Sequence, residues 1–180
     1  MGRCNFSSGE ACQRGAKLWG QVLDIVKRRR PWRAGWALLG LVDTLADLPA
    51  GINGREALVA NLRSMASVLR DLQSENGHWH TVLDHPETYL ESSISCFDCA
   101  AFLKGMRTGL LDFSFEECVR RSRRALLGAV SQTGQILVSE ATPEGDLASY
   151  QALALGVFPW GQGPALRAIE ELLISSGAVN

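Results

Sequence analysis

The sequence has no long hydrophobic run and no excess of either charge. None of its apolar stretches approaches the roughly 20 residues that a membrane-spanning helix needs. Residues 1–15 are polar and lack the apolar centre of a signal peptide. The 18 basic and 19 acidic side chains give a formal net charge of −1. We therefore expect no membrane insertion, no nucleic-acid partner and a cytoplasmic location.

Cysteine is present, but not in the pattern of a disulfide framework or a zinc site. There are five cysteines, and Cys96 and Cys99 form a single C-x-x-C inside an apolar helical pattern. His78, His80 and His85 lie in one loop, without an identifiable partner at metal-ligand spacing. We expect buried, reduced cysteines and no metal or organic cofactor. Metal or redox chemistry at the C-x-x-C is the alternative.

Strand signals are scarce, because no run alternates with period two for long. Apolar residues instead recur at helical spacing. Asn53 with Glu56, and Ser114 with Glu117, have the spacing of a helix-capping box, and Pro164 suits the first turn of a last helix. The pattern predicts an all-α fold, with no sheet beyond small loop pairings. Helices are expected near residues 35–48, 53–76, 91–109, 114–134, 147–155 and 164–174.

A repeated loop organises these helices. The heptapeptide at residues 18–24 resembles that at residues 78–84, and residues 134–139 follow the next helix pair at a similar interval. Units of two helices with this period are typical of helical arrays and of toroids of helical hairpins. The helices near 35–48 and 91–109 are apolar and rich in small residues, so we expect them to form an inner layer. The charged, amphipathic helices would lie outside.

In a toroid the repeated loops lie at one end, around the mouth of a central cavity. Aromatic side chains at such a mouth suit sugar rings, whose C–H faces stack on them. We expect four tryptophans to converge there: Trp19, Trp32, Trp36 and Trp79.

Five short motifs carry a resemblance to one enzyme family. They are GHWHTVLD at residues 77–84, YLESSISC at 89–96, KGMRTG at 104–109, TPEG at 142–145 and PWGQG at 159–163. They resemble the G-L-W-x-Q-V-L-D, Y-L-E-x-S-x-S, K-G-x-R-x-G, T-P-x-G and P-x-G-Q-G motifs of glycoside hydrolase family 88/105. These are the unsaturated glucuronyl and rhamnogalacturonyl hydrolases, and the resemblance covers about residues 32–173.

The resemblance implies a six-hairpin (α/α)6 barrel that hydrolyses 4,5-unsaturated uronic acids from oligosaccharides released by lyases. An aspartic acid of such enzymes protonates the C4–C5 double bond, water adds to C5, and no cofactor takes part. The family's catalytic aspartates come from the first half of the barrel. We therefore expect residues 17–180 to form the C-terminal half, with about three hairpins, after a poorly defined segment at residues 1–16. The catalytic acid would lie outside this chain.

The same resemblance implies four substrate-binding residues. Arg33 would pair with the substrate carboxylate, and Trp36 would stack on the sugar ring, with packing between inner helices as an equal alternative. Trp32 belongs to the same motif, which is two residues shorter than the family's W-x-R-G-N-G-W. Gln21 stands where the family has a histidine. Glutamine can bond a hydroxyl but cannot carry a proton near neutral pH.

Other candidates have simpler structural explanations. Trp79 is expected to anchor its loop to the core. Glu91 suits the N-terminus of a helix, where an acidic side chain interacts favourably with the backbone dipoles. Asp43 and Asp47 lie one turn apart on an inner helix, where edge or ion-pair roles are favoured over catalysis.

Two functions follow from these observations. The first is part of an unsaturated-uronide hydrolase, truncated and inactive without the missing half. The alternative is a non-catalytic helical-repeat binding domain, which Gln21 and the shortened tryptophan motif favour. The expected ligand is an unsaturated uronic-acid oligosaccharide. Inner helices left without neighbours are expected to cause self-association.

Overall fold

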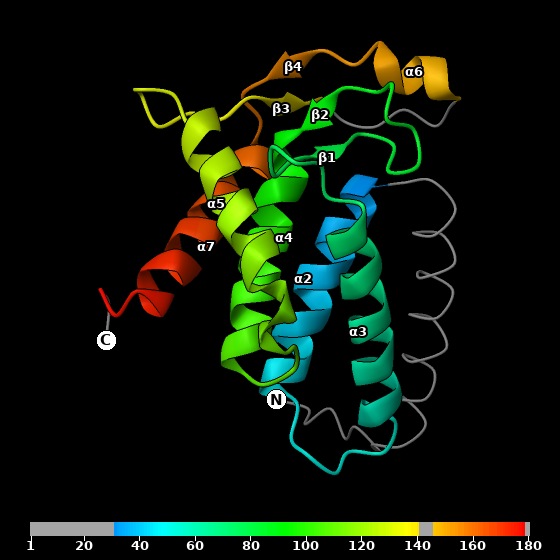
Figure 1. Cartoon of the computed structure of the whole chain (residues 1–180), viewed down its shortest axis with the longest axis vertical. Helices are drawn as coiled ribbons and strands as arrows, with labels where there is room; N and C mark the ends of the chain where they lie inside the picture. Colours follow the sequence, from blue (N-terminus) through cyan, green and yellow to red (C-terminus); the bar gives the residue numbers. More distant parts are fainter. Residues whose placement is uncertain (1–30, 141–145, 179–180) are drawn as a thin grey trace, which may run out of the picture.

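The computed structural model describes residues 31–140 and 146–178, and its helices form two layers (Figure 1). Three helices make the inner row: α2 (Pro31–Asp47), α4 (Ser92–Arg107) and α7 (Pro159–Ser175). Helix α4 lies in the middle and packs against both α2 and α7. The outer helices are α3 (Arg55–Asp71), which packs on α2, and α5 (Glu116–Ala129), which packs on α4. The predicted inner and outer layers are therefore confirmed.

The remaining elements are short and lie mostly at one end of the helices. The three inner helices begin at this end, which is the top of Figure 1. Strand β1 (Trp79–His80) pairs with β2 (Leu90–Glu91), and β3 (Val138–Ser139) pairs with β4 (Leu155–Gly156). The only other elements of the described ranges are α6 (Leu147–Gln151) and the 3-10 turn η1 (Phe113–Phe115). The all-α prediction, with small loop pairings only, is confirmed.

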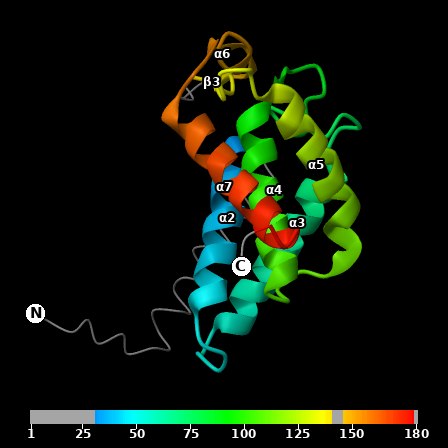
Figure 2. The same ribbon diagram turned by 90° about the vertical axis from the view of Figure 1, so that its left-hand side faces the viewer.

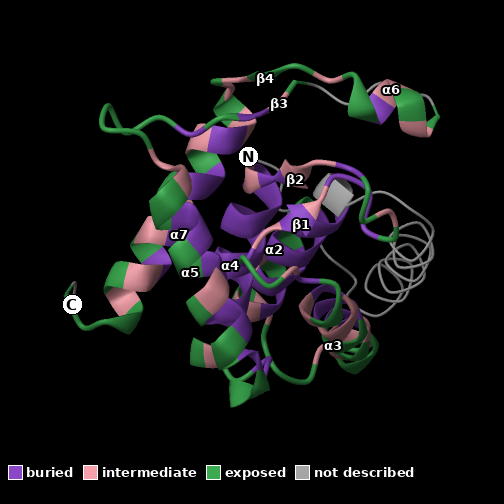
Figure 3. Cartoon of the chain, turned by 45° about the horizontal axis from the view of Figure 1, so that its top comes forward, coloured by how far each residue is buried: buried purple, intermediate pink, exposed green. Residues whose placement is uncertain are grey.

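Small residues let the inner helices approach one another closely. A side chain at Gly35 of α2 would place its Cβ 2.8 Å from the Cβ of Phe97 on α4. Figure 3 shows α4 buried along most of its length. The apolar, small-residue composition of α4 thus reflects contact on all sides. No helix among the described residues combines the length and hydrophobicity of a membrane span.

Four predicted helix starts were wrong. Helix α2 begins at Pro31 and not near residue 35. Helix α3 follows Gly54, whose φ of +88° is costly for residues with a Cβ, so Asn53 does not cap it. Asp112, rather than Ser114, makes the cap before α5, because its carboxylate accepts the Ser114 N–H. Helix α7 starts at Pro159, and Pro164 lies inside it. Proline at the first helical position leaves no hydrogen bond unmade, which explains the earlier start.

Candidate functional site

Trp79 is an anchor of the loop end and not part of a cavity wall. Its side chain is fully buried, and its indole Nε1–H donates to the carbonyl of Leu69 at 2.7 Å. The bond ties β1 to the last turn of α3. The anchor prediction is confirmed, and the expectation that Trp79 converges with the other tryptophans on the mouth of a cavity was wrong. An indole with its N–H satisfied inside the core has no free face for a ligand.

Trp36 is an exposed aromatic side chain on an inner helix at this end. It lies in the second turn of α2 and is 49% exposed. Its ring leans on Phe97 of α4, with centroids 4.7 Å apart and planes at 42°. Phe97 supports one side of the indole, and much of the rest is open to solvent. The ring thus packs on an inner helix and keeps surface on which a sugar could stack.

The other predicted binding residues are only partly covered by the structure. Trp32 and Arg33 lie in the first turn of α2, where the backbone is described and the side chains are not. These positions are four and three residues before Trp36, the spacings that bring residues to one side of a helix. Gln21 and Trp19 lie outside the described residues.

Glu91 joins the two small hairpins to α4. It is 1% exposed, and one carboxylate oxygen accepts the Ser93 N–H at 3.1 Å at the start of α4. The other oxygen accepts the Ser139 N–H of β3 at 3.2 Å. The predicted helix-terminus role is confirmed, and the bond to β3 adds a second structural role.

The three histidines of the loop do not converge. His78 shares a hydrogen bond with Ser95 at 3.0 Å, and burial lowers its pKa, while the charge of Glu91 acts in the opposite direction. His80 bonds the Thr88 carbonyl, and His85 bonds Glu87. Within residues 31–140 and 146–178, no group of three histidine, cysteine or acidic side chains is placed to hold a metal ion.

The PWGQG motif fixes α7 to the loop before α6. The indole of Trp160 donates to the Ser139 carbonyl at 2.9 Å. The Gln162 amide bonds both backbone groups of Ile136, at 2.8 and 3.3 Å. A side chain at Gly161 would meet Val138 at 2.6 Å, so glycine permits this contact. The motif therefore has a structural role.

The KGMRTG motif ties the inner helices together near their far ends. Lys104 donates to Asp43 of α2 at 2.6 Å, and Arg107 makes bonds of 2.9 and 3.0 Å with Glu171 of α7. Arg167 bridges the two acids, at 3.3 Å from Asp43 and 3.2 Å from Glu171. The ion-pair role expected for Asp43 is confirmed. Sequence reasoning missed Glu171, which is fully buried.

Asp98 is a buried acid that the sequence interpretation overlooked. It is 0% exposed, and neither carboxylate oxygen has a hydrogen-bond partner. Burial raises its pKa well above the ordinary value and raises the pKa of the adjacent Cys99 thiol to about 12. Cys96, Cys99 and Cys118 are buried and unpaired, as expected. The missed signal was one acid within the otherwise apolar and small-residue stretch 94–103.

Comparisons with known proteins agree with the motifs. The sequence model described as Glycosyl Hydrolase Family 88 matches residues 31–175. The unsaturated rhamnogalacturonyl hydrolase YesR of Bacillus subtilis is 33% identical over 142 residues, which are 77% of this chain and 40% of that protein. An unsaturated 3S-rhamnoglycuronyl hydrolase of Formosa agariphila is 33% identical over 105 residues, 57% of this chain and 28% of that protein. The chain thus spans less than half the length of these relatives.

Solved structures share the helical arrangement. A possible member of family GH105 from Salmonella enterica superposes with a TM-score of 0.77 at 29% identity, covering 82% of this chain and 40% of that one. A family 105 glycoside hydrolase of C. acetobutylicum gives 0.68 at 29% identity, covering 77% of this chain and 44% of that one. These matches confirm the predicted fold, part of an (α/α)6 toroid.

Proposed function

Because the chain belongs to glycosyl hydrolase family 88, we propose that it forms the C-terminal part of a hydrolase acting on unsaturated uronic-acid oligosaccharides. The two relatives, an unsaturated rhamnogalacturonyl hydrolase and an unsaturated 3S-rhamnoglycuronyl hydrolase, support this substrate class by the activities in their names. The chain matches only 40% and 28% of their lengths, so its role is proposed as part of a larger site.

The observation that carries the proposal is the position of Trp36. It stands half-exposed at the end of the inner layer where the loops gather, and Phe97 holds its ring. Positions 32 and 33 lie within one turn of it. In the proposal Trp36 and Trp32 stack on the sugar, Arg33 pairs with the uronate carboxylate, and Gln21 bonds a hydroxyl.

The proposal assigns no catalytic acid to this chain. An acid that protonates a substrate must reach it within hydrogen-bonding distance. Both oxygens of Glu91 accept backbone N–H groups, and Asp43 is held by a lysine and an arginine. Asp98 has a raised pKa, but it is sealed inside the core. We propose that the acid comes from a part of the barrel outside these residues.

The test separates binding from turnover. The purified chain is titrated with an unsaturated uronide disaccharide by calorimetry, and hydrolysis is followed as loss of the double-bond ultraviolet absorbance. We expect binding without turnover, weakened tenfold or more by Trp36→Ala or Arg33→Ala. Phe113→Ala is the matched control, because Phe113 is 78% exposed in η1, outside the loop end that carries Trp36. Turnover by the chain alone, abolished by Glu91→Gln or Asp43→Asn, would overturn the assignment of the acid.

One observation favours the alternative of a non-catalytic binding domain. The acids considered above are not available to a substrate. Glu91 and Asp43 already have hydrogen-bond or ion-pair partners, and Asp98 is buried in the core. The indole of Trp36, in contrast, is half-exposed. Sugar binding that persists without turnover, even when the rest of a family barrel is supplied, would support this alternative.

Two further features complete the proposal. We infer a cytoplasmic location, which the buried and unpaired Cys96, Cys99 and Cys118 favour. We also infer self-association, because apolar side chains remain exposed on the inner helices, including Trp36, Leu166 and Leu173.

A further inference from the structure

Phe97 of α4 is a buried aromatic side chain that meets α2 at two consecutive residues. Helices α2 and α4 run side by side (Figure 2). A Cβ at Gly35 would lie 2.8 Å from the Cβ of Phe97, and the next residue, Trp36, places its ring centroid 4.7 Å from that of Phe97. Phe97 is 3% exposed, whereas Trp36 is 49% exposed. One ring is therefore part of the core, and the other lies on it with surface open to solvent.

The surroundings of Phe97 hold it in place. Its neighbours in α4, Cys96 and Asp98, are both fully buried. One turn earlier, Glu91 accepts the Ser93 N–H and ties the start of α4 to β3. Side chains in a close-packed interior stay in one rotamer, because there is no empty space to turn into. Phe97 is therefore a rigid support for the ring that lies on it.

Gly35 determines how closely the indole approaches this support. The 2.8 Å separation is shorter than two carbon atoms of this kind adopt, and the Phe97 Cβ is attached directly to the backbone of α4. It cannot swing aside as the end of a long side chain could. Alanine at position 35 would therefore push α2 away from α4 at this point. Because Trp36 follows Gly35 directly, its indole would move away from Phe97.

We propose that Phe97 is a positioning residue for sugar binding, which holds the Trp36 indole in one orientation before a ligand arrives. This rests on the proposed function, which supplies the uronide as the ligand of Trp36. An unsupported, half-exposed indole would have to be ordered on binding, and ordering one such side chain weakens affinity about two- to twelvefold. With Phe97 the order is already present in the free protein. Phe97 acts through Trp36 and does not touch the sugar.

Fluorine NMR of the chain labelled with 5-fluorotryptophan tests the positioning without any sugar. The Trp36 resonance is the one that disappears in Trp36→Phe. We expect Phe97→Leu and Gly35→Ala each to shift it, because the neighbouring ring is removed in one and displaced in the other. Phe102→Leu is the matched control, since Phe102 is a fully buried ring of the same helix that packs on Phe115 at 5.1 Å. An unchanged Trp36 resonance in Phe97→Leu, or an equal shift in Phe102→Leu, would overturn the positioning.

A nuclear Overhauser effect between the indole protons of Trp36 and the ring protons of Phe97 checks the contact in the natural chain, where no substitution can disturb folding. We expect to observe it, and its absence would overturn the contact itself. Circular dichroism shows that each variant is folded before its resonance is compared.

Calorimetric titration with the uronide disaccharide tests the consequence for binding. Phe97→Leu should weaken the affinity about two- to twelvefold, and less than Trp36→Ala does. Phe102→Leu should leave it unchanged, although it removes the same atoms from the core. If Trp36→Ala weakens binding and Phe97→Leu does not, the positioning role is wrong and the proposed function stands.

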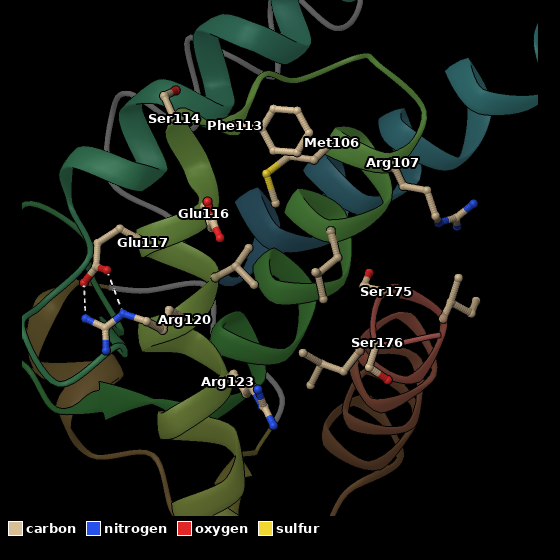
Figure 4. Close-up of a pocket in the computed structure, with 14 residues that line it drawn as sticks. Met106, Arg107, Phe113, Ser114, Glu116, Glu117, Arg120, Arg123, Ser175 and Ser176 are labelled. Carbon is tan, nitrogen blue, oxygen red and sulfur yellow. Dashed lines mark hydrogen bonds and ion pairs between the residues drawn. The ribbon is translucent and has the colours of Figure 1, made fainter. Parts of the chain in front are cut away.

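The groove between α5 and α7 provides the arm that tests the proposed function separately. It has a volume of about 1010 Å³ and lies over the end of α4, with Met106 in its lining (Figure 4). Met106 is nine residues after Phe97, about 13 Å further along the helix. Binding that Met106→Ala weakens and Trp36→Ala leaves unchanged would place the sugar in the groove. That result would overturn the proposed function of Trp36, and with it the role of Phe97 in sugar binding, while the fluorine spectra would still report the contact between the two rings.

Discussion

Helices α4 and α7 are both inner helices, yet their surroundings differ sharply. Twelve of the 16 residues of α4 are buried, against five of the 17 residues of α7. Helix α4 has α2 and α7 beside it and α5 outside it, whereas α7 has only α4 as a major neighbour among the described elements. Apolar side chains are thus almost all core in α4, whereas α7 leaves Leu166 and Leu173 exposed. Burial follows from the neighbours, and the spacing shows only which face is available.

The largest expected effect comes from comparing a buried position of α4 with an exposed position of α7. Phe102→Ala on α4 should lower the free energy of unfolding by about 3–5 kcal/mol, because it empties a fully buried site. Leu166→Ala on α7, at a side chain that is 68% exposed, should change it by no more than about 0.5 kcal/mol. Urea denaturation at high dilution, where the self-association proposed above is weakest, measures both. Similar losses in the two variants would show that α7 is covered in the monomer.

The sequence predicted the layers better than the contacts that hold them. The small residues around Gly35 and the apolar helix starting at Glu91 were enough to identify α2 and α4 as inner helices, because helical spacing is local. The inner position of α7 was not predicted. The bonds between Arg107 and Glu171, 64 positions apart, were not predictable, since nothing local specifies which acid an arginine will meet. Trp79 and Trp36 show the same limit at the loop end. Both are tryptophans at the loop end, Trp79 in β1 and Trp36 in α2, and tertiary packing decided that one is buried and the other exposed.

The buried position of Asp98 on α4 should make the free energy of unfolding depend on pH. Burial raises its pKa in the folded state, so the folded protein keeps a proton that the unfolded chain releases. The stability linked to this proton is complete below the unfolded pKa and is lost as the pH rises toward the folded value. The slope approaches about 1.4 kcal/mol per pH unit for one proton. Urea denaturation between pH 5 and 8, on the order of three pH units, should show the decline in the natural chain.

Asp98→Asn should remove this part of the pH dependence, because asparagine keeps the size of the side chain but does not ionise. The expected result is a flatter profile, with the largest difference from the natural chain at high pH. An unchanged slope in Asp98→Asn would mean that other groups carry the linkage and that Asp98 is accessible to solvent.

A smaller effect is expected where α7 is joined to α4 by charge. Arg107→Met removes the donor of two short bonds to Glu171, which is fully buried and then keeps only Arg167. We expect a loss of about 1–3 kcal/mol, typical of a buried charged acceptor that loses a partner. Arg120→Met is the matched control, because it breaks a pair with Glu117 whose side chains are both 58% exposed, and should have no measurable effect. Thermal unfolding compares the two, and equal shifts would contradict the special place of Glu171.

The smallest expected loss of stability comes from removing a hydrogen bond at the first turn of α7. Trp160→Phe removes the indole N–H that donates to the Ser139 carbonyl at 2.9 Å. It keeps a ring to stack on Phe158, whose centroid lies 4.8 Å away with planes at 4°. A single lost hydrogen bond should cost about 1 kcal/mol. Amide hydrogen exchange at residues 136–139 should accelerate, while exchange in the middle of α4 stays unchanged. Acceleration along the whole of α7 would instead mean that this bond holds the helix in place, so that contact with α4 alone is too weak to keep α7 in the inner row.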